Sequence, residues 1–238
     1  LALRADNQGE GGILALYALL RRHRRHWIYA VAIIGSATLL ADGVITPAIT
    51  VTTAIEGLRG ISPELPVLPV TIAVITIVFF VQRFGTKNVG RSFGTFMLLW
   101  FLMLGSVGAV WLVDSPVVLK AFSPHYAVML LVHSPEWFMV LGAVFLCTTG
   151  AEALYSDLGH CGRSNITVSW AFVKAMLILN YLGQGAWMLS YPERALGGDN
   201  PFFAIMPHGM LLVAVVMATG AAIVASQALI SGSFSILS

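Results

Sequence analysis

Three long stretches without a charged side chain limit what this chain can fold into more than any other feature. They comprise 18 residues from Leu65 to Gln82, 22 from Ser92 to Val113 and 39 from Asn200 to Ser238. About 20 apolar residues are enough for a helix that crosses a bilayer. In addition, 58% of the residues are hydrophobic and only 10% are charged, whereas soluble domains carry about 25% charged residues. The sequence therefore excludes a water-soluble domain and indicates a membrane protein.

The apolar segments are continuous and show no strand-like alternation. Inside lipid every backbone polar group must find its partner within the protein, which favours helices over a barrel here. We predict an all-α, polytopic membrane protein that forms a single transmembrane domain, residues 1–238. Its expected transmembrane helices are six, at residues 27–55, 67–81, 93–113, 137–155, 166–189 and 210–234.

Basic residues are distributed unevenly between the two sides of these spans. One side carries three, Arg59, Lys120 and Arg194, and the other carries eight, Arg21, Arg22, Arg24, Arg25, Arg83, Lys87, Arg91 and Arg163. Because cytoplasmic loops carry the Lys/Arg excess, we expect a multi-pass protein of the cell (inner) membrane with these basic loops in the cytoplasm. The basic run beside the first span could also bind nucleic acid, but a topology signal explains it better, and no nucleic-acid partner is expected.

The chain starts at Leu1 rather than Met and stops at Ser238, directly after an apolar run. It lacks the basic start, apolar core and cleavage site of a signal peptide. We expect an internal piece of a longer protein, without that protein's first spans and C-terminal region.

The carboxylate of Asp42 lies close to the middle of the first predicted span. An Asp at a helix centre costs about 2.5–3.5 kcal/mol on insertion, so such a residue is interpreted as functional. Thr46 and Thr50 follow Asp42 at positions i+4 and i+8, which places them on roughly the same helix face. Pro47 lacks an N–H and should leave the Gly43 carbonyl without its helical partner. These oxygen-bearing groups together predict an oxygen-lined cavity in which an ion can bind.

Two alternatives stay open for this cluster. The threonines can bond to their own helix while Pro47 only makes a kink. Asp42 can also pair with a basic group, for which Lys174 in the fifth span is the charged candidate within the spans. Lys174 can instead snorkel or face a polar crevice, so it is a candidate pathway residue.

A second polar cluster occupies the end of the fourth span. Thr149, Glu152 and Tyr155 repeat every three residues and share one face. Gly150 beside threonines can mark a broken helix that exposes carbonyls to an ion. Burial would favour the neutral form of Glu152 and allow proton exchange; the alternative is an ordinary carboxylate at the cytoplasmic interface.

Several common site types have no support in this sequence. The two cysteines, Cys147 and Cys161, form no disulfide framework or metal spacing, and the six histidines show no metal spacing. No Walker motif is present. We therefore expect neither a cofactor nor a catalytic centre, and the chain is not predicted to be an enzyme.

Eight motifs in one order resemble the Kup/HAK/KT family of potassium uptake transporters. They are spread along the whole chain: RADNQGEGGI at residues 4–13, DGVITPAI at 42–49, IEGL at 55–58, QRFGT at 82–86, WFL at 100–102, GAEALYSDLGH at 150–160, NYLGQG at 180–185 and ASQALISG at 225–232. Each motif alone is modest, but the ordered set is specific. The resemblance implies an APC-superfamily bundle with a LeuT-like inverted repeat, of which the chain covers about spans 3 to 8.

The implied activity is secondary active potassium uptake, by K⁺/H⁺ symport with alternating access. By this resemblance Asp42, Thr46, Thr50, Thr149 and Glu152 match positions near the ion pathway, and K⁺ is held through Asp42, Thr46 and Thr149. Tyr155 and Lys174 are further pathway candidates, although apolar residues are usual in the family where Lys174 stands. The implied partners are the potassium ion, protons, the lipid bilayer and a candidate homodimer.

Two other functions are alternatives. An amino-acid or other cation transporter of the APC superfamily would need more room and a charged partner for its substrate. An intramembrane hydrolase would use Asp42 with Glu152 or Asp157, and would require both carboxyls within about 5–10 Å of each other. Neither alternative explains the ordered motifs.

Overall fold

A computed structural model describes residues 7, 11–20, 26–60, 64, 66–82, 90–148, 155, 162–196 and 200–237. Its regular elements are all helical. The α-helices are α1 Ile13–Leu20, α2 His26–Glu56, α3 Val67–Gln82, α4 Gly90–Asp114, α5 Pro124–His133, α6 Trp137–Thr148, α9 Arg163–Ser190, α10 Pro192–Leu196, α11 Pro201–Ala204 and α12 Leu211–Leu237. Three short 3₁₀ helices link them: η3 Gly57–Gly60, η4 Pro116–Phe122 and η5 His208–Met210.

Among the described residues, four helices are long and apolar enough to cross a membrane: Trp27–Arg59, Phe93–Asp114, Arg163–Ser190 and His208–Gln227. They lie on four of the six predicted spans. The other two coincide with shorter apolar helices, α3 of 16 residues and α6 of 12 residues. The predicted all-α, polytopic membrane class is confirmed, while the number of spans and their boundaries stay predictions.

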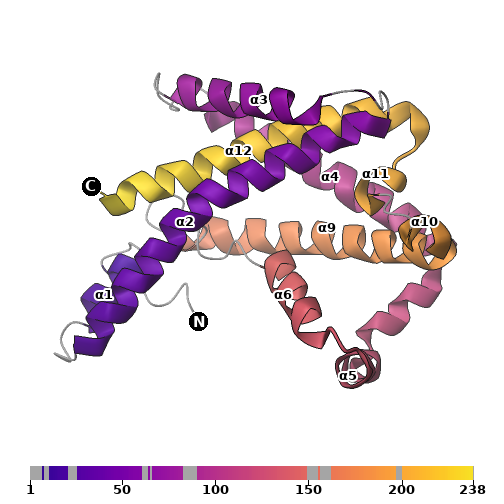
Figure 1. Ribbon diagram of the computed structural model, residues 1–238, viewed down its shortest axis with the longest axis horizontal. Helices are drawn as coiled ribbons and strands as arrows, with labels where there is room; N and C mark the ends of the chain where they lie inside the picture. Colours follow the sequence, from indigo (N-terminus) through magenta and orange to yellow (C-terminus); the bar gives the residue numbers. More distant parts are fainter. Residues whose placement is uncertain are drawn as a thin grey trace.

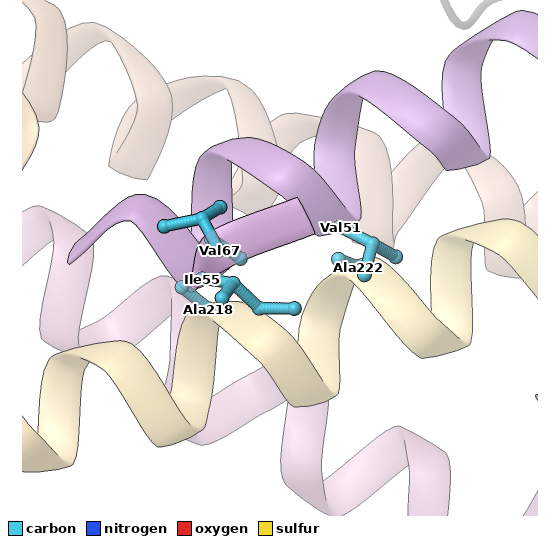
Figure 2. Packing of buried hydrophobic residues seen from close by; sticks show 6 residues of the cluster. Val51, Ile55, Val67, Ala218 and Ala222 are labelled. Carbon is cyan, nitrogen blue, oxygen red and sulfur yellow. The ribbon is translucent and has the colours of Figure 1, made fainter. Parts of the chain in front are cut away.

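Helices α2 and α12 lie side by side along much of their length, and α3 lies beside them at the top of the view, against the C-terminal part of α2 (Figure 1). Small side chains allow this close packing: Ala218 and Ala222 of α12 face Ile55 and Val51 of α2, and Val67 of α3 closes the cluster (Figure 2). Val51 and Ile55 are almost completely buried. Because lipid tails are as apolar as these side chains, tight contact rather than water exclusion holds the helices together.

Glycines bring α4 and α9 into backbone contact. A Cβ atom at Gly183 of α9 would lie 2.5 Å from the Cα of Gly108 on α4, and one at Gly108 would overlap the Leu179 carbonyl. Beside this crossing, the Asn180 amide nitrogen donates to the Leu104 carbonyl at 3.4 Å. Small residues and interhelical hydrogen bonds commonly hold membrane helices together.

Large apolar side chains face outward along the long helices. Val44 is 74% exposed, Val113 79% and Phe138 76%. In water such a surface would lead to aggregation, but in a bilayer these side chains contact lipid tails, as expected of membrane-spanning helices.

A short segment between α9 and α12 crosses the end of the bundle. It contains α10, α11 and η5, and the Trp111 indole N–H of α4 donates to the Ile205 carbonyl at 2.9 Å. The side chains of Ile205 and Met206 are buried together with Val107 and Trp187. This anchoring places α11 against the C-terminal end of α2.

Candidate functional site

Asp42 lies near the centre of α2, as the sequence predicts. It is 16 residues after the first residue of the helix, His26, and 14 before the last, Glu56. At about 1.5 Å rise per residue, more than 20 Å of helix lies on either side of it. Its side chain is half-buried. The carboxylate is therefore at a depth where lipid cannot solvate it, and other groups of the protein must do so.

The first group of the protein that can solvate the Asp42 carboxylate is the hydroxyl of Thr46, one helical turn after Asp42. Thr46 Oγ1 donates to Asp42 Oδ1 at 2.5 Å. A hydroxyl carries one hydrogen and two lone pairs, so Thr46 Oγ1 keeps its acceptor capacity after this donation. A carboxylate and a hydroxyl oxygen thus lie side by side at mid-helix, and the sequence prediction that Asp42 and Thr46 share a face agrees with this contact.

Thr50 behaves differently. Its hydroxyl donates to the Thr46 carbonyl at 2.8 Å and contacts the Pro47 carbonyl at 3.3 Å. This backbone bonding is the alternative that the sequence left open for the threonines, and it applies to Thr50 but not to Thr46. A hydroxyl keeps its two lone pairs after it donates, so Thr50 Oγ1 can still act as an acceptor.

Pro47 lies inside α2, between the two threonines. Because proline has no N–H, it gives no hydrogen bond to the Gly43 carbonyl. Both Gly43 and Pro47 are buried. The Gly43 carbonyl is therefore a third oxygen group, beside the Thr46 hydroxyl and the Asp42 carboxylate, within about one turn of helix. Oxygen donors of this kind, neutral groups plus one carboxylate, suit a weakly hydrated monovalent cation.

An apolar cavity of about 410 Å³, which lies largely open to its surroundings, adjoins this part of α2. Thr50 and Thr53 line it from α2, together with Met97 and Trp100 of α4. Alanines of α12 and the α11 segment complete its wall, through Ala218, Ala221, Ala222, Ala225, Asn200, Phe202 and Phe203. Thr50 therefore lies between this cavity and the Thr46–Asp42 pair, which is one to two turns nearer the N-terminus of the same helix.

A second cavity, of about 620 Å³, lies at the C-terminal end of α2. We call it the polar cavity because charged and polar side chains gather there, namely Glu56, Arg59, Arg194, Asn200 and His208. Arg194 also lies over the ring of Trp187, 5.6 Å from its centroid. The two cavities share Asn200 and Phe203 in their linings.

Two residues of the second predicted cluster, Thr149 and Glu152, lie outside the described residues. Tyr155 is described and is 8% exposed. Its backbone oxygen and ring are so close to Gly11 that a Cβ there would overlap them. The structure thus packs Tyr155 against the segment before α1, and the proximity of this cluster to Asp42 stays a prediction.

Lys174 lies on an exposed face of α9. Its ammonium is 5.1 Å from the centroid of the Trp170 ring, one turn earlier on the same helix. A cation over the face of an indole ring is stabilised by the ring quadrupole. The contact seen for Lys174 is therefore with its own helix, and its roles as a partner of Asp42 or as a pathway residue stay predictions.

Sequence reasoning missed the α11 segment as a part of the site. Asn200 caps α11, its Oδ1 accepting from the Phe202 N–H at 3.0 Å. The Asn-Pro pair at Asn200 and Pro201 is a typical helix start and could have signalled this short helix. No local signal places Phe203 between two cavities, because that position depends on how distant helices pack.

Comparison with known proteins supplies the family context. A family model described as "K+ potassium transporter integral membrane domain" matches residues 1–238. The chain is 52% identical to "Probable potassium transport system protein Kup" of Flavobacterium johnsoniae over 245 residues. It is 51% identical to the protein of the same name from Latilactobacillus sakei over 253 residues, and 51% to "Probable potassium transport system protein Kup 1" of Lactococcus lactis over 249.

Each of these matches covers 100% of this chain and 37% of the relative. The chain therefore spans little more than a third of the length of these curated relatives. No solved structure matched it. The relatives are named as transport proteins, and the helices and the family description agree on a multi-pass membrane protein.

Proposed function

Because the chain belongs to the K+ potassium transporter integral membrane domain family, we propose that the whole protein takes up potassium ions together with protons, by alternating access. The observation that best supports this proposal is the hydrogen bond from Thr46 to Asp42 in the middle of α2. It places a carboxylate next to a hydroxyl at a depth where an unpaired charge is unfavourable. A cation bound there would neutralise Asp42.

Potassium fits this chemistry better than a small divalent ion. It is large and gives up its hydration shell to neutral oxygens such as carbonyls and hydroxyls. Asp42, Thr46 and the Gly43 carbonyl would supply oxygens from α2, and Thr149 would supply another. Thr50, which lines the apolar cavity, would bind the ion before it reaches this site.

A proton carrier is needed for symport, and two carboxylates are candidates. Asp42 would bind either the ion or a proton, because protonation removes the charge that attracts K⁺. Glu152 is the second candidate by its place beside Thr149 in the sequence. The removal of both charges should abolish the response of uptake to external pH, whichever of them carries the proton.

The distribution of basic residues suggests the orientation. With Arg21, Arg22, Arg24, Arg25 and Arg163 in the cytoplasm, α2 begins at the inner face of the cell membrane and the polar cavity opens to the outside. The inverted-repeat bundle and a homodimer remain predictions.

The test is uptake of radioactive rubidium by the full-length protein in cells without their own potassium uptake systems. We expect uptake that potassium competes away and that a more acidic exterior stimulates. Uptake that amino acids inhibit and potassium does not would instead support an amino-acid carrier of the same superfamily. No rubidium uptake at any pH would refute the proposal.

A further inference from the structure

The polar cavity lies where two of the long helices reach the surface of the membrane. Glu56 is the last residue of α2 and Leu211 the first residue of α12, and both line the cavity. α2 has 31 residues. At about 1.5 Å rise per residue it is about 46 Å long, which matches a bilayer of about 40–45 Å with its headgroups. The cavity therefore lies at the depth of the lipid headgroups, beside α10 and α11 at the right-hand end of the bundle (Figure 1).

Positive groups outnumber negative ones on the wall of this cavity. Arg59 of η3 and Arg194 of α10 line it, and Glu56 is the carboxylate among its lining residues. His208 and Leu211 line it as well, so the N-terminal, positive end of the α12 dipole lies at the same wall. The two guanidinium groups and the helix dipole together attract an anion, and Glu56 opposes them with a single charge.

The core of the bundle holds Arg194 in position. Its guanidinium lies over the ring of Trp187, 5.6 Å from the centroid. Trp187 is only 1% exposed and packs with Val107 and Ile205. A guanidinium that stacks on an aromatic ring keeps its N–H donors at its edge, and their planar fork matches the oxygens of a phosphate group. Because this side chain is already ordered, less conformational entropy is lost when an anion binds to it.

The remaining wall of the cavity is largely apolar. Phe203, Ala204, Met206 and Leu211 line it on this side. Its volume of about 620 Å³ lies within the range of about 300–1,000 Å³ that is usual for small-molecule sites. A cavity that combines arginines with an apolar wall at headgroup depth suits a phospholipid, because the phosphate of such a lipid lies next to its acyl chains.

We propose that the polar cavity is a phosphate-binding site in which Arg59 and Arg194 bind the phosphate oxygens. The phosphate group belongs either to an anionic phospholipid or to free inorganic phosphate, and the arginines recognise the chemistry that both share. This site is separate from the Thr46–Asp42 pair, and the inference does not depend on the direction of transport. Bound phosphate would neutralise the excess positive charge at this end of α2.

The experiment measures how each phosphate source stabilises the purified full-length protein in detergent. A ligand that binds only the folded state raises the thermal midpoint as its concentration increases. One arm titrates dihexanoyl-phosphatidylglycerol, and its reference is dihexanoylglycerol, which has the same acyl chains but no phosphate. The other arm titrates inorganic phosphate, and its reference is chloride at the same ionic strength.

We expect at least one phosphate source to stabilise the parent beyond its reference. Arg59→Gln should raise the half-maximal concentration roughly tenfold, because a charge-assisted contact with phosphate is lost. Glu56→Gln should lower that concentration, because it removes the carboxylate that repels the anion. Arg163→Gln is the matched control and should change nothing, since Arg163 is exposed at the opposite end of α9. Stabilisation by phosphatidylglycerol alone would assign the site to a lipid, and stabilisation by inorganic phosphate alone to the free ion.

A second variant keeps the test decisive if Arg59→Gln folds poorly. Ala204→Trp fills part of the cavity without any change of charge and should also weaken the stabilisation. The inference is overturned if neither source stabilises the parent beyond its reference, or if Arg59→Gln and Ala204→Trp both keep the parental half-maximal concentration. An equal effect of Arg59→Gln and Arg163→Gln would overturn it as well. Rubidium uptake is not part of this measurement, so a failure of uptake would count against the proposed function alone.

Discussion

Thr46 donates its hydroxyl hydrogen to the carboxylate of Asp42 across one turn of α2, at 2.5 Å. The two side chains lie in the middle of a 31-residue helix that is interrupted by Pro47. Hydrogen bonds to charged groups contribute about 1.5–3 kcal/mol. The hydrogen bond thus gives the mid-helix carboxyl group a partner and sets two side-chain oxygens side by side.

This pair predicts how substitutions of Thr46 act. Thr46→Val keeps the shape but removes the hydroxyl, and we expect the apparent affinity for rubidium to fall about tenfold, as the loss of a group worth roughly 1.4 kcal/mol would give. Thr46→Ser should retain most of the affinity. The matched control is Thr52→Val, because Thr52 bonds only the Ala48 carbonyl at 2.7 Å. Equal affinity of the Thr46→Val protein and the parent would contradict the assignment.

Pro47 is expected to matter for transport rather than for stability. Pro47→Ala restores an N–H that can bond the Gly43 carbonyl, and alanine is about 3 kcal/mol more favourable than proline within a helix. The thermal midpoint of the detergent-solubilised protein should therefore rise or stay the same. Rubidium uptake should fall, because a backbone oxygen is withdrawn from the site. Unimpaired uptake by a correctly inserted Pro47→Ala protein would show that this carbonyl has no role.

The glycine contact between α4 and α9 should be sensitive to a single methyl group. Gly183→Ala places a Cβ 2.5 Å from the Cα of Gly108, so the helices have to separate. We expect the free energy of unfolding to fall by about 1–3 kcal/mol, which is typical of overpacking. This loss should appear as a lower thermal midpoint. Gly142→Ala is the control, since nothing lies within 4 Å of a Cβ at that position. If Gly183→Ala leaves the thermal midpoint as unchanged as Gly142→Ala does, the close crossing of α4 and α9 is contradicted.

The long helices were predictable from the sequence because bilayer thickness leaves a strong local signal. Residues 27–55 were expected to form a helix and α2 covers His26–Glu56; residues 166–189 lie within α9, Arg163–Ser190. Lipid demands internal hydrogen bonding over some 20 residues, so each span can be recognised without knowledge of its neighbours.

The short helices were not predicted. α5, α10 and α11 contain 10, 5 and 4 residues, which is too few for a periodic pattern to stand out. Their positions depend on contacts with distant parts of the chain, such as Trp111 with the Ile205 carbonyl. The same holds for the two cavities, whose walls combine residues from α2, α4, α11 and α12.

Contacts of the candidate site within one helix could be predicted from the sequence. Contacts that depend on side-chain rotamers or on packing between helices could not. Helical periodicity alone places Thr46 beside Asp42, and the structure has them in contact. The bond from Thr50 to the Thr46 carbonyl depends on a side-chain rotamer that the sequence does not specify. The relation of Asp42 to Thr149 and Glu152 depends on packing between spans and remains a prediction.

The most direct test of the account is rubidium uptake at several external pH values by full-length protein with Asp42→Asn, with Glu152→Gln or with both. Asparagine keeps the size of Asp42 and an oxygen that can accept from Thr46, but it removes the charge. We predict that at least one single substitution abolishes acid-stimulated uptake, with the amount of protein in the membrane unchanged. Parental, pH-dependent uptake in both single variants and in the double variant would contradict the claim that these carboxylates carry the ion and the proton.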